Sequence, residues 1–216
     1  MVYEVLQNLN QNIDNYIFDK YKNLMSKPLN KHGHSQKGFI IWLTGLPCSG
    51  KTTIARSLKS YLLSNQFSVC VLDGDLIRKG LSSDLDFSRE GRKENIRRIG
   101  EVARILTDAN IITITSTISP FRRDRSNLRK IFEPGQFIEC YLDCPKEECE
   151  KRDIKGTYKL AKKGKISNFT GVSSPYEPPD KPEINIKTHI HDIQECTDQI
   201  VRFLSKNNYI SLKNIE

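Results

Sequence analysis

Short apolar runs alternate with longer amphipathic stretches over most of the chain. The runs are rich in β-branched residues and too short for buried helices, so they predict buried strands. The longer stretches repeat apolar residues every three or four positions, which is typical of one helix face. The pattern predicts strands at residues 39–44, 68–72, 111–117, 137–142 and 183–187, and helices at residues 52–64, 88–110 and 190–204.

Helical segments separate most of these strands, so neighbouring strands are expected to pair in parallel. The sequence therefore predicts an α/β fold of three layers, with a five-stranded, mainly parallel sheet between helices. Residues 155–182 carry lysines, glycines and four prolines, and we interpret them as a loop or lid. Residues 1–37 are interpreted as an extension with a short helix and a polar linker, residues 38–206 as the domain, and residues 207–216 as a tail.

The composition suits one globular domain, because 37% of the 216 residues are hydrophobic and 28% are charged. No apolar run approaches the roughly 20 residues that cross a membrane, and the first residues do not resemble a secretion signal. Six cysteines lack the paired spacing of a zinc site, so reduced thiols and a cytoplasmic protein are expected. The net charge of +8 fits either a lysine-rich solvated surface or attraction for polyanions. No nucleic-acid-binding module accompanies it, so we expect neither nucleic acid nor a membrane as a partner.

The strongest local motif lies between the first predicted strand and the first predicted helix. Residues 45–52 read GLPCSGKT and fit the phosphate-binding pattern G-x-x-x-x-G-K-[ST]. Glycines let successive backbone N–H groups point at phosphate oxygens, and the helix that follows adds the positive end of its dipole. Lys51 is expected to reach the β- and γ-phosphates of ATP, and the Thr52 hydroxyl to bind Mg²⁺. The predicted ATP-binding residues are Gly45, Leu46, Pro47, Cys48, Ser49, Gly50, Lys51, Thr52 and Thr53.

This phosphate-binding loop, or P-loop, occurs in kinases, GTPases and ATPases alike. The N-K-x-D guanine signature of GTPases is absent from the sequence. The third predicted strand also lacks the final aspartate that helps to hold the metal in typical ATPases. Both absences argue against those two classes.

Two carboxylates, Asp73 and Asp75, follow the second predicted strand. They should lie at the same carboxyl edge of the sheet as the P-loop, where open α/β sheets bind ligands. A carboxylate there can accept a proton from an attacking hydroxyl or hold Mg²⁺ through water, although such a pair can also cap a turn. Asp75 is our preferred general base, and Asp73 its partner on the metal or substrate side.

The predicted helix that begins near residue 88 is dense in arginines. Arg92 and Asn95 are three residues apart and therefore share a face. Guanidinium groups fit phosphate and sulfate oxygens, whereas the alternative interpretation is a solvated basic face. Ser119 follows the third strand and precedes a proline, a position that by itself is typical of a turn.

Taken together, these segments resemble the adenylylsulfate kinase (APS kinase) family over residues 38–204. Their order and spacing extend well beyond general P-loop features. Besides the P-loop and residues 73–75 with Arg78, the matching segments are Gly80-Leu81, residues 87–98, Ile118-Ser119-Pro120, Arg152-Asp153, Lys155-Gly156, Tyr158, Phe169-Thr170-Gly171 and residues 174–179.

The resemblance implies transfer of the γ-phosphate of ATP, with Mg²⁺, to the 3′-hydroxyl of adenosine 5′-phosphosulfate. It implies that Phe87 and Phe169 enclose the adenine of this acceptor, that the lid closes over it, and that the protein forms a homodimer. Ser119 matches a serine described in the family as phosphorylated, but we expect it to orient the substrate, since in-line transfer needs no protein nucleophile. The implied catalytic residues are Lys51, Asp75 and Ser119, and the implied acceptor-binding residues are Asp73, Arg78, Phe87, Arg92, Asn95, Ser119, Lys155 and Phe169.

Two other functions stay open at this stage. One is a P-loop kinase with a different small acceptor, such as a nucleoside or a sugar. The other is a non-catalytic nucleotide-binding subunit, against which the intact Lys51, Thr52 and Asp75 argue. The chain also departs from the family at Cys48, where a glycine is usual inside the P-loop, and at neighbouring Pro47.

Overall fold

A computed structural model describes residues 36–211, in which five strands form one sheet. The strands are β1 (Ile40–Thr44), β2 (Val69–Asp73), β3 (Ile112–Ser116), β4 (Phe137–Asp143) and β5 (Ile184–Lys187). Their order in the sheet is β2-β3-β1-β4-β5, and every neighbouring pair is parallel. Each strand begins and ends within two residues of its predicted position, so the parallel α/β fold is confirmed.

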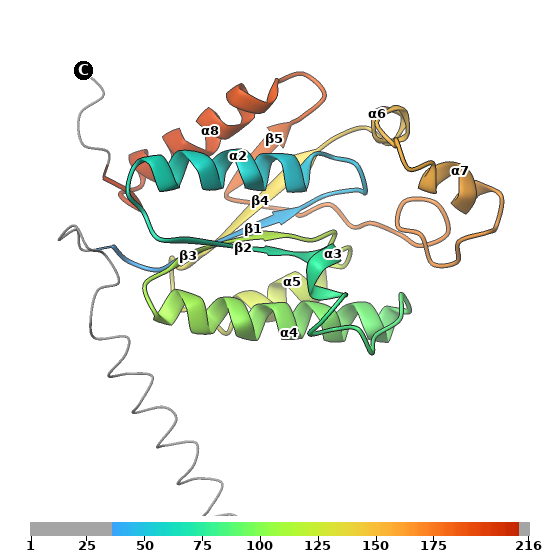
Figure 1. The fold of residues 1–216 in the computed structure, drawn as a ribbon, viewed down its shortest axis with the longest axis horizontal. Helices are drawn as coiled ribbons and strands as arrows, with labels where there is room; N and C mark the ends of the chain where they lie inside the picture. The colour runs from blue at the N-terminus through green and yellow to red at the C-terminus, as the bar shows by residue number, and fades with distance from the viewer. Residues whose placement is uncertain (1–35, 212–216) are drawn as a thin grey trace, which may run out of the picture. The chain divides into compact units, whose positions relative to one another are not determined.

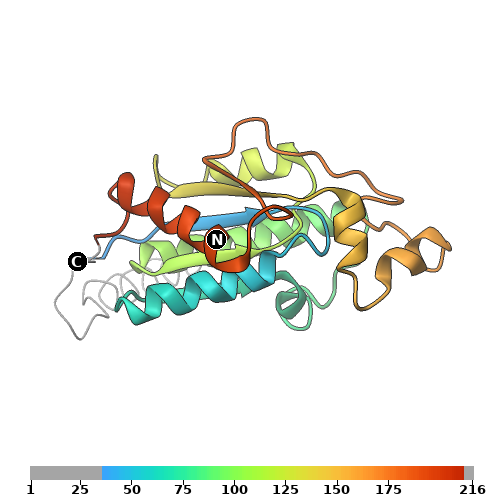
Figure 2. The same ribbon diagram turned by 90° about the horizontal axis from the view of Figure 1, so that it is seen from above.

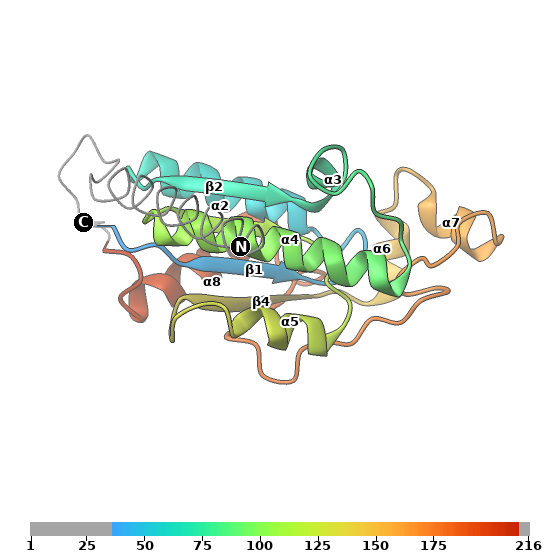
Figure 3. The same ribbon diagram turned by 90° about the horizontal axis from the view of Figure 1, so that it is seen from below.

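Helices cover both faces of this sheet (Figure 1). One face packs against α2 (Lys51–Ser64) and α8 (Ile193–Lys206), which run side by side in Figure 2. The other face packs against α4 (Arg89–Asp108) and α5 (Arg122–Arg129), which are in front in Figure 3. Three short helices, α3 (Gly74–Ile77), α6 (Lys146–Lys151) and α7 (Thr157–Lys162), lie beyond the carboxyl ends of the strands. The result is the predicted three-layer arrangement.

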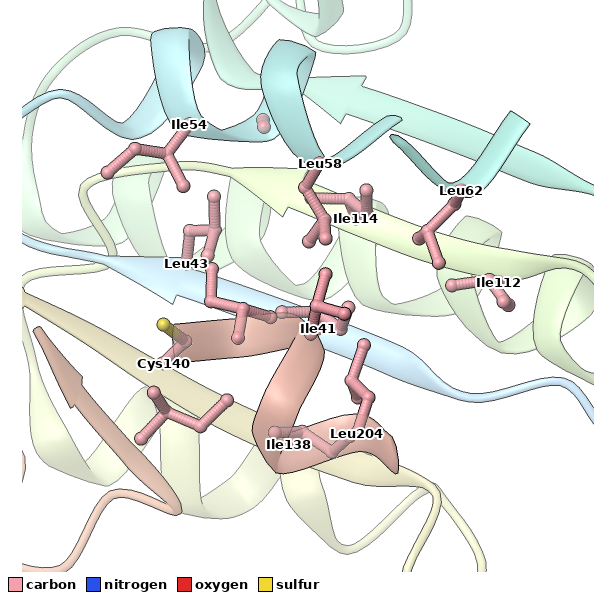
Figure 4. Close-up of a cluster of buried hydrophobic side chains, with 14 of the residues drawn as sticks. Ile41, Leu43, Ile54, Leu58, Leu62, Ile112, Ile114, Ile138, Cys140 and Leu204 are labelled. Atoms are coloured by element: carbon pink, nitrogen blue, oxygen red, sulfur yellow. The ribbon is translucent and has the colours of Figure 1, made fainter. Parts of the chain in front are cut away.

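Alternate residues of the central strand β1 supply the two halves of the core. Ile41 and Leu43 pack with Leu58 and Leu204 in the half under α2 and α8 (Figure 4). Ile40 and Trp42 pack with residues of α4 and α5 in the other half. Because both faces are covered, all five β1 residues are buried, which explains the unbroken apolar run from Ile40 to Leu43. Truncating a fully buried residue such as Leu58 to alanine should cost about 2–5 kcal/mol of stability.

Helix ends differ from the prediction where side chains cap them. Helix α8 begins at Ile193 rather than at residue 190, because Asp192 forms a capping box with Glu195. The Asp192 carboxylate accepts from the Glu195 backbone N–H at 2.8 Å, and the Glu195 carboxylate accepts from the Asp192 N–H at 3.0 Å. Helix α4 begins after Ser88, whose hydroxyl accepts from the Gly91 N–H at 3.0 Å.

The sequence pattern did not predict the short helices α3, α5, α6 and α7. Helix α7 lies within residues 155–182, for which the sequence predicts a loop or lid, and it buries Tyr158 and Ala161. The predicted N-terminal helix and the end of the tail lie outside the described residues. Within residues 36–211, no helix has the length and apolar character to cross a bilayer.

Candidate active site

A cavity of about 1080 Å³ opens where the carboxyl ends of the strands meet the lid. All the predicted catalytic and acceptor-binding residues line it. So do the predicted ATP-binding residues except Gly45, Leu46 and Ser49. The structure therefore brings the two predicted sets together in one space.

The P-loop places one lysine against its own backbone. Gly50 has a φ of 97°, a left-handed conformation that glycine adopts without strain, and it caps the start of α2. From the first turn, Lys51 Nζ donates to the carbonyls of Gly45 at 3.0 Å and Leu46 at 2.6 Å, and to Ser49 Oγ at 3.3 Å. Burial lowers the pKa of Lys51 to about 8, although the nearby carboxylates of Asp73 and Asp75 oppose this shift. A buried cation with only neutral hydrogen-bond acceptors suits an anionic ligand.

Cys48 explains why glycine is usual at its position. Its φ of 63° is a left-handed conformation that costs an L-residue about 1–2 kcal/mol. Burial and the negative charge of Asp153 raise the pKa of the Cys48 thiol. The thiol therefore stays protonated near neutral pH, and the substitution adds no negative charge to the phosphate-binding loop.

Three oxygen-bearing side chains meet beside the P-loop. Thr52 Oγ1 donates to Asp73 Oδ2 at 2.9 Å and lies 3.0 Å from Ser116 Oγ at the end of β3. The other oxygen of Asp73 accepts from the backbone N–H of Asp75 at 3.0 Å and so caps α3. Mg²⁺ prefers oxygen ligands, so this set of hydroxyls and a carboxylate fits the ion. Sequence analysis missed Ser116, which takes the position where ATPases carry an aspartate.

Asp75 is arranged differently from Asp73. It belongs to the first turn of α3, its side chain is exposed, and it faces the cavity. A carboxylate at this position is accessible to a hydroxyl group bound in the cavity, as a general base must be.

Two arginines carry the charge at the far end of the cavity. Arg78 Nη1 donates to the carbonyls of Leu85 at 3.1 Å and Asp86 at 3.0 Å, and its guanidinium lies 4.2 Å from the centre of the Phe87 ring. Arg92 Nε donates to the Phe87 carbonyl at 3.0 Å, and Arg92 Nη2 donates to the Asn168 carbonyl in the lid. Burial lowers the pKa of Arg92, and the like charge of Arg78 lowers it further. Two desolvated guanidinium groups that repel each other form an anion-binding position.

Several buried polar atoms in this cavity have no hydrogen-bond partner within the described residues. They are Asn95 Oδ1, Thr117 Oγ1 and Thr170 Oγ1. An unpaired buried polar group costs about 1–3 kcal/mol, so a bound ligand that pairs with these atoms recovers that energy. The predicted role of Asn95 in ligand binding therefore has a physical basis. Thr170 belongs to a segment that resembles the family, but neither it nor Thr117 was predicted to bind the ligand.

Two aromatic rings reach the cavity from different segments. Phe87, just before α4, is 55% exposed, so its ring is accessible to a ligand in the cavity. Phe169 comes from the lid and packs edge-on against Tyr158, with ring centres 4.9 Å apart. Lys155 lines the same side of the cavity from the segment before α7. These rings can stack on a planar base.

Ser119 is more constrained than its sequence suggested. It is buried with a φ of 40°, and its Oγ accepts a hydrogen bond from Trp42 Nε1 at 3.0 Å. Arg125 donates to the Ser119 carbonyl and forms a buried ion pair with Glu139 at 2.6 Å. The hydroxyl proton of Ser119 stays available for a ligand in the cavity, while the rest of the residue is fixed.

A second group of cavity-lining residues was not predicted as part of the site. Arg152 Nη2 donates to the Thr188 carbonyl at 2.7 Å. Thr188 follows β5 at the carboxyl end of that strand. Open α/β sheets bind ligands at this edge, so the position of Thr188 could have indicated a site residue. Arg152 belongs to a segment that resembles the family but was given no role, and His191 and Ile193 carried no sequence signal. The cavity-lining residues of this group are Arg152, Thr188, His191 and Ile193.

Comparison with known proteins identifies the family to which the chain belongs. A sequence model described as adenylylsulphate kinase matches residues 37–187. The adenylyl-sulfate kinase of Thermodesulfovibrio yellowstonii is 50% identical over 184 residues, which cover 85% of this chain and 92% of that protein. The crystallised APS kinase of Mycobacterium tuberculosis, in complex with AMPPNP and APS, is 37% identical with a TM-score of 0.76, covering 79% of this chain and 99% of that one. A hexameric APS kinase from Thiobacillus denitrificans is 33% identical with a TM-score of 0.64, covering 82% of this chain and 31% of that one. This chain belongs to the adenylylsulfate kinase family.

Proposed function

We propose that this chain transfers the γ-phosphate of ATP to the 3′-hydroxyl of adenosine 5′-phosphosulfate. One observation carries the proposal: a single cavity has the P-loop at one end and a pair of desolvated arginines with two aromatic rings at the other. Two separate anion-binding ends suit two nucleotides that meet between them. The M. tuberculosis relative binds both an ATP analogue and APS, which supports the same pair of ligands here.

At the donor end, backbone N–H groups of the P-loop and the ammonium of Lys51 neutralise the phosphates. Thr52, Asp73 and Ser116 would hold Mg²⁺, which would add positive charge beside the phosphoryl group. Phosphoryl transfer depends mainly on such charge neutralisation and on positioning. Lys51 must leave its carbonyl partners to follow the charge that develops on the transferred group.

At the acceptor end, Arg78 and Arg92 bind the phosphosulfate, and Phe87 and Phe169 stack on the adenine. Asn95 pairs its buried oxygen with a donor on the acceptor. Asp75 accepts the proton of the 3′-hydroxyl while the 3′ oxygen attacks the γ-phosphorus. The bond between the γ-phosphorus and the bridging oxygen breaks, and ADP leaves. Ser119 is fixed by Trp42 and Arg125. Its hydroxyl donates a hydrogen bond to the acceptor and so orients the acceptor.

The lid limits hydrolysis. Water competes with the acceptor hydroxyl for the γ-phosphate, and a segment that contacts the nucleotide from above excludes it. Lys155 and Phe169 are among the lid residues that line the cavity, so acceptor binding and water exclusion depend on the same segment.

The test is ADP release in a coupled assay with and without adenylyl sulfate, with Mg²⁺ present or chelated. We expect release that requires both the acceptor and the metal, and a product phosphorylated at the 3′ position by ³¹P NMR. Equal or faster release with a nucleoside or a sugar would favour the alternative acceptor class. Retained ATP binding without turnover on any acceptor would favour a non-catalytic subunit.

We also propose that the chain acts as a homo-oligomer in the cytoplasm, where MgATP is abundant. The hexameric relative supports self-association of this fold, and a dimer is the simplest such state. Light scattering after size-exclusion chromatography measures the mass directly, and a mass of one chain at micromolar concentration would contradict the proposal.

A further inference from the structure

Tyr158 connects the donor loop to the acceptor ring. It lies in the first turn of α7 and is only 2% exposed. Its hydroxyl donates to the Pro47 carbonyl in the P-loop at 3.1 Å. Its ring packs edge-on against Phe169 at an interplanar angle of 72°. One side chain therefore contacts both ends of the proposed two-nucleotide site.

The contact is part of a larger apolar junction between the P-loop and the lid. Leu46 and Cys48 of the P-loop pack in one cluster with Tyr158, Phe169 and lid residue Val172. At Gly171, which follows the ring-bearing segment, an added Cβ would lie 2.9 Å from Leu46 Cδ2. At such close approach, a shift of residues 46–48 displaces the segment that carries Phe169.

The backbone of Tyr158 is fixed independently of the P-loop. Asp153 accepts from the Tyr158 backbone N–H at 2.6 Å and from Thr157 Oγ1 at 3.0 Å. These bonds hold the start of α7 in place. The contact with Pro47 then sets the position of the Tyr158 ring rather than the position of the helix.

The P-loop segment that Tyr158 contacts must change when phosphate binds. Lys51 Nζ holds the carbonyls of Gly45 and Leu46, which are the two peptides immediately before Pro47. An ammonium that turns to phosphate oxygens releases both carbonyls. The orientation of the Pro47 carbonyl, and with it the hydrogen bond to Tyr158, therefore depends on whether phosphates are bound.

We propose that Tyr158 is a positioning residue that couples the two nucleotide sites: it moves the Phe169 ring into place for the acceptor when the donor phosphates order the P-loop. The inference rests on the proposed function, because it takes Phe169 as the acceptor-stacking ring. It predicts that donor and acceptor raise each other's affinity by the same factor, as linkage requires.

The test compares wild type with Tyr158→Phe, which removes one hydroxyl and keeps the ring. Calorimetry measures the Kd of adenylyl sulfate alone and with a saturating non-hydrolysable ATP analogue plus Mg²⁺. We expect the analogue to tighten wild-type acceptor binding by about tenfold, within the usual range of such coupling. The variant should lose at least two-thirds of this factor, while its acceptor affinity without the analogue stays within twofold of wild type. Tyr209→Phe, whose ring packs against Phe39 away from the cavity, should keep the full factor.

Two results would overturn the inference: a wild-type factor near one, or an unchanged factor in Tyr158→Phe. A loss of acceptor affinity that is equal with and without the analogue would also overturn it, since that result indicates a purely structural role. Failure of the proposed function is distinguishable, because wild type would then release no ADP in response to adenylyl sulfate.

Discussion

The two ends of the cavity are built in opposite ways. The donor end is one continuous loop, residues 45–52, that binds phosphate mainly through its backbone. The acceptor end combines side chains from the α4 region, the turn after β3 and the lid. Backbone recognition tolerates side-chain change, as Pro47 and Cys48 illustrate, whereas recognition by side chains does not. We therefore expect substitutions to affect chemistry at the donor end and acceptor affinity at the other end.

The ends also differ in their charge carriers. Lys51 is buried and its pKa is lowered to about 8, so its charge varies within an accessible pH range. Arg78 and Arg92 keep their charge at any such pH, because the pKa of an arginine begins above 12. Sensitivity to pH should consequently belong to the donor end.

The largest expected effect is that of Lys51→Ala. Loss of a preorganised charge beside the transferred group should lower kcat by about a thousandfold, as removal of a comparable group does in other enzymes. Lys59→Ala, on the same helix but outside the cavity, should keep wild-type kcat in the ADP-release assay. A decrease of less than tenfold for Lys51→Ala would mean that the P-loop backbone alone carries donor catalysis.

Asp75→Asn should lower kcat by about a hundredfold or more, because it removes the proposed general base and keeps the shape of the side chain. The affinities for both nucleotides should change little. Asp108→Asn is the matched control. Asp108 and its partner Arg104 lie near the C-terminal end of α4, whereas the α4 residues that line the cavity, Arg92, Asn95 and Ile96, lie in its first half. Near-normal turnover of Asp75→Asn would remove the base role.

Phe169→Ala sharpens the contrast between the ends. Loss of one stacked ring, worth about 1–3 kcal/mol, should weaken acceptor binding by roughly five- to a hundredfold. Binding of ATP alone should stay within twofold of wild type. Phe169→Leu, which keeps apolar packing against Tyr158, separates stacking from packing. Equal losses for both ligands would contradict the assignment of Phe169 to the acceptor.

The smallest effect is a pH dependence confined to ATP. Above pH 8 the free protein loses the Lys51 proton, which a bound phosphate restores, so ATP binding takes up a proton. The Kd for ATP should rise about tenfold between pH 7 and pH 9, while the Kd for adenylyl sulfate stays constant. Calorimetry in buffers of different ionisation enthalpy measures the uptake. A flat profile for ATP, or an equal rise for both ligands, would break the comparison.

The effect of Lys51 on stability has the opposite sign. Its pKa is lower in the folded protein, about 8, than the unperturbed value of 10.5. Between these two values the unfolded chain binds more protons, so the contribution of Lys51 to stability increases as the pH rises. Weaker ATP binding above pH 8 would therefore not reflect unfolding caused by this residue.

Sequence patterns predicted the parts of the fold that repeat over many residues. The strands are apolar runs bounded by turn residues, the three long helices each bury a periodic apolar face, and their positions agree with the structure within three residues. The four short helices were not predicted, because four to eight residues are too few to show a helical repeat of apolar positions. Helix α7 shows the physical reason, since Tyr158 packs on the P-loop and bonds to Pro47, a contact between residues 111 positions apart that no local pattern encodes.

The same division holds for the site. The P-loop follows from a motif, the carboxylates of Asp73 and Asp75 from the edge rule, and Arg92 with Asn95 from helix spacing. The edge rule also covers Ser116 at the end of β3, although sequence analysis assigned it no role. Arg125 could not be predicted, because its partners Glu139 and Glu177 lie 14 and 52 residues away. The Trp42 bond that occupies Ser119 joins residues 77 positions apart, and no local pattern encodes it.

Trp42 has a practical consequence. It is the one tryptophan in the sequence, it is fully buried in β1, and its indole N–H is bonded to a residue that lines the cavity. Excitation at the red edge of aromatic absorption selects tryptophan. The emission of the protein therefore comes from Trp42 alone, in a single environment that the structure describes. Acceptor binding that pulls the Ser119 hydroxyl towards the ligand would alter that emission, so titration and stopped-flow kinetics need no added label.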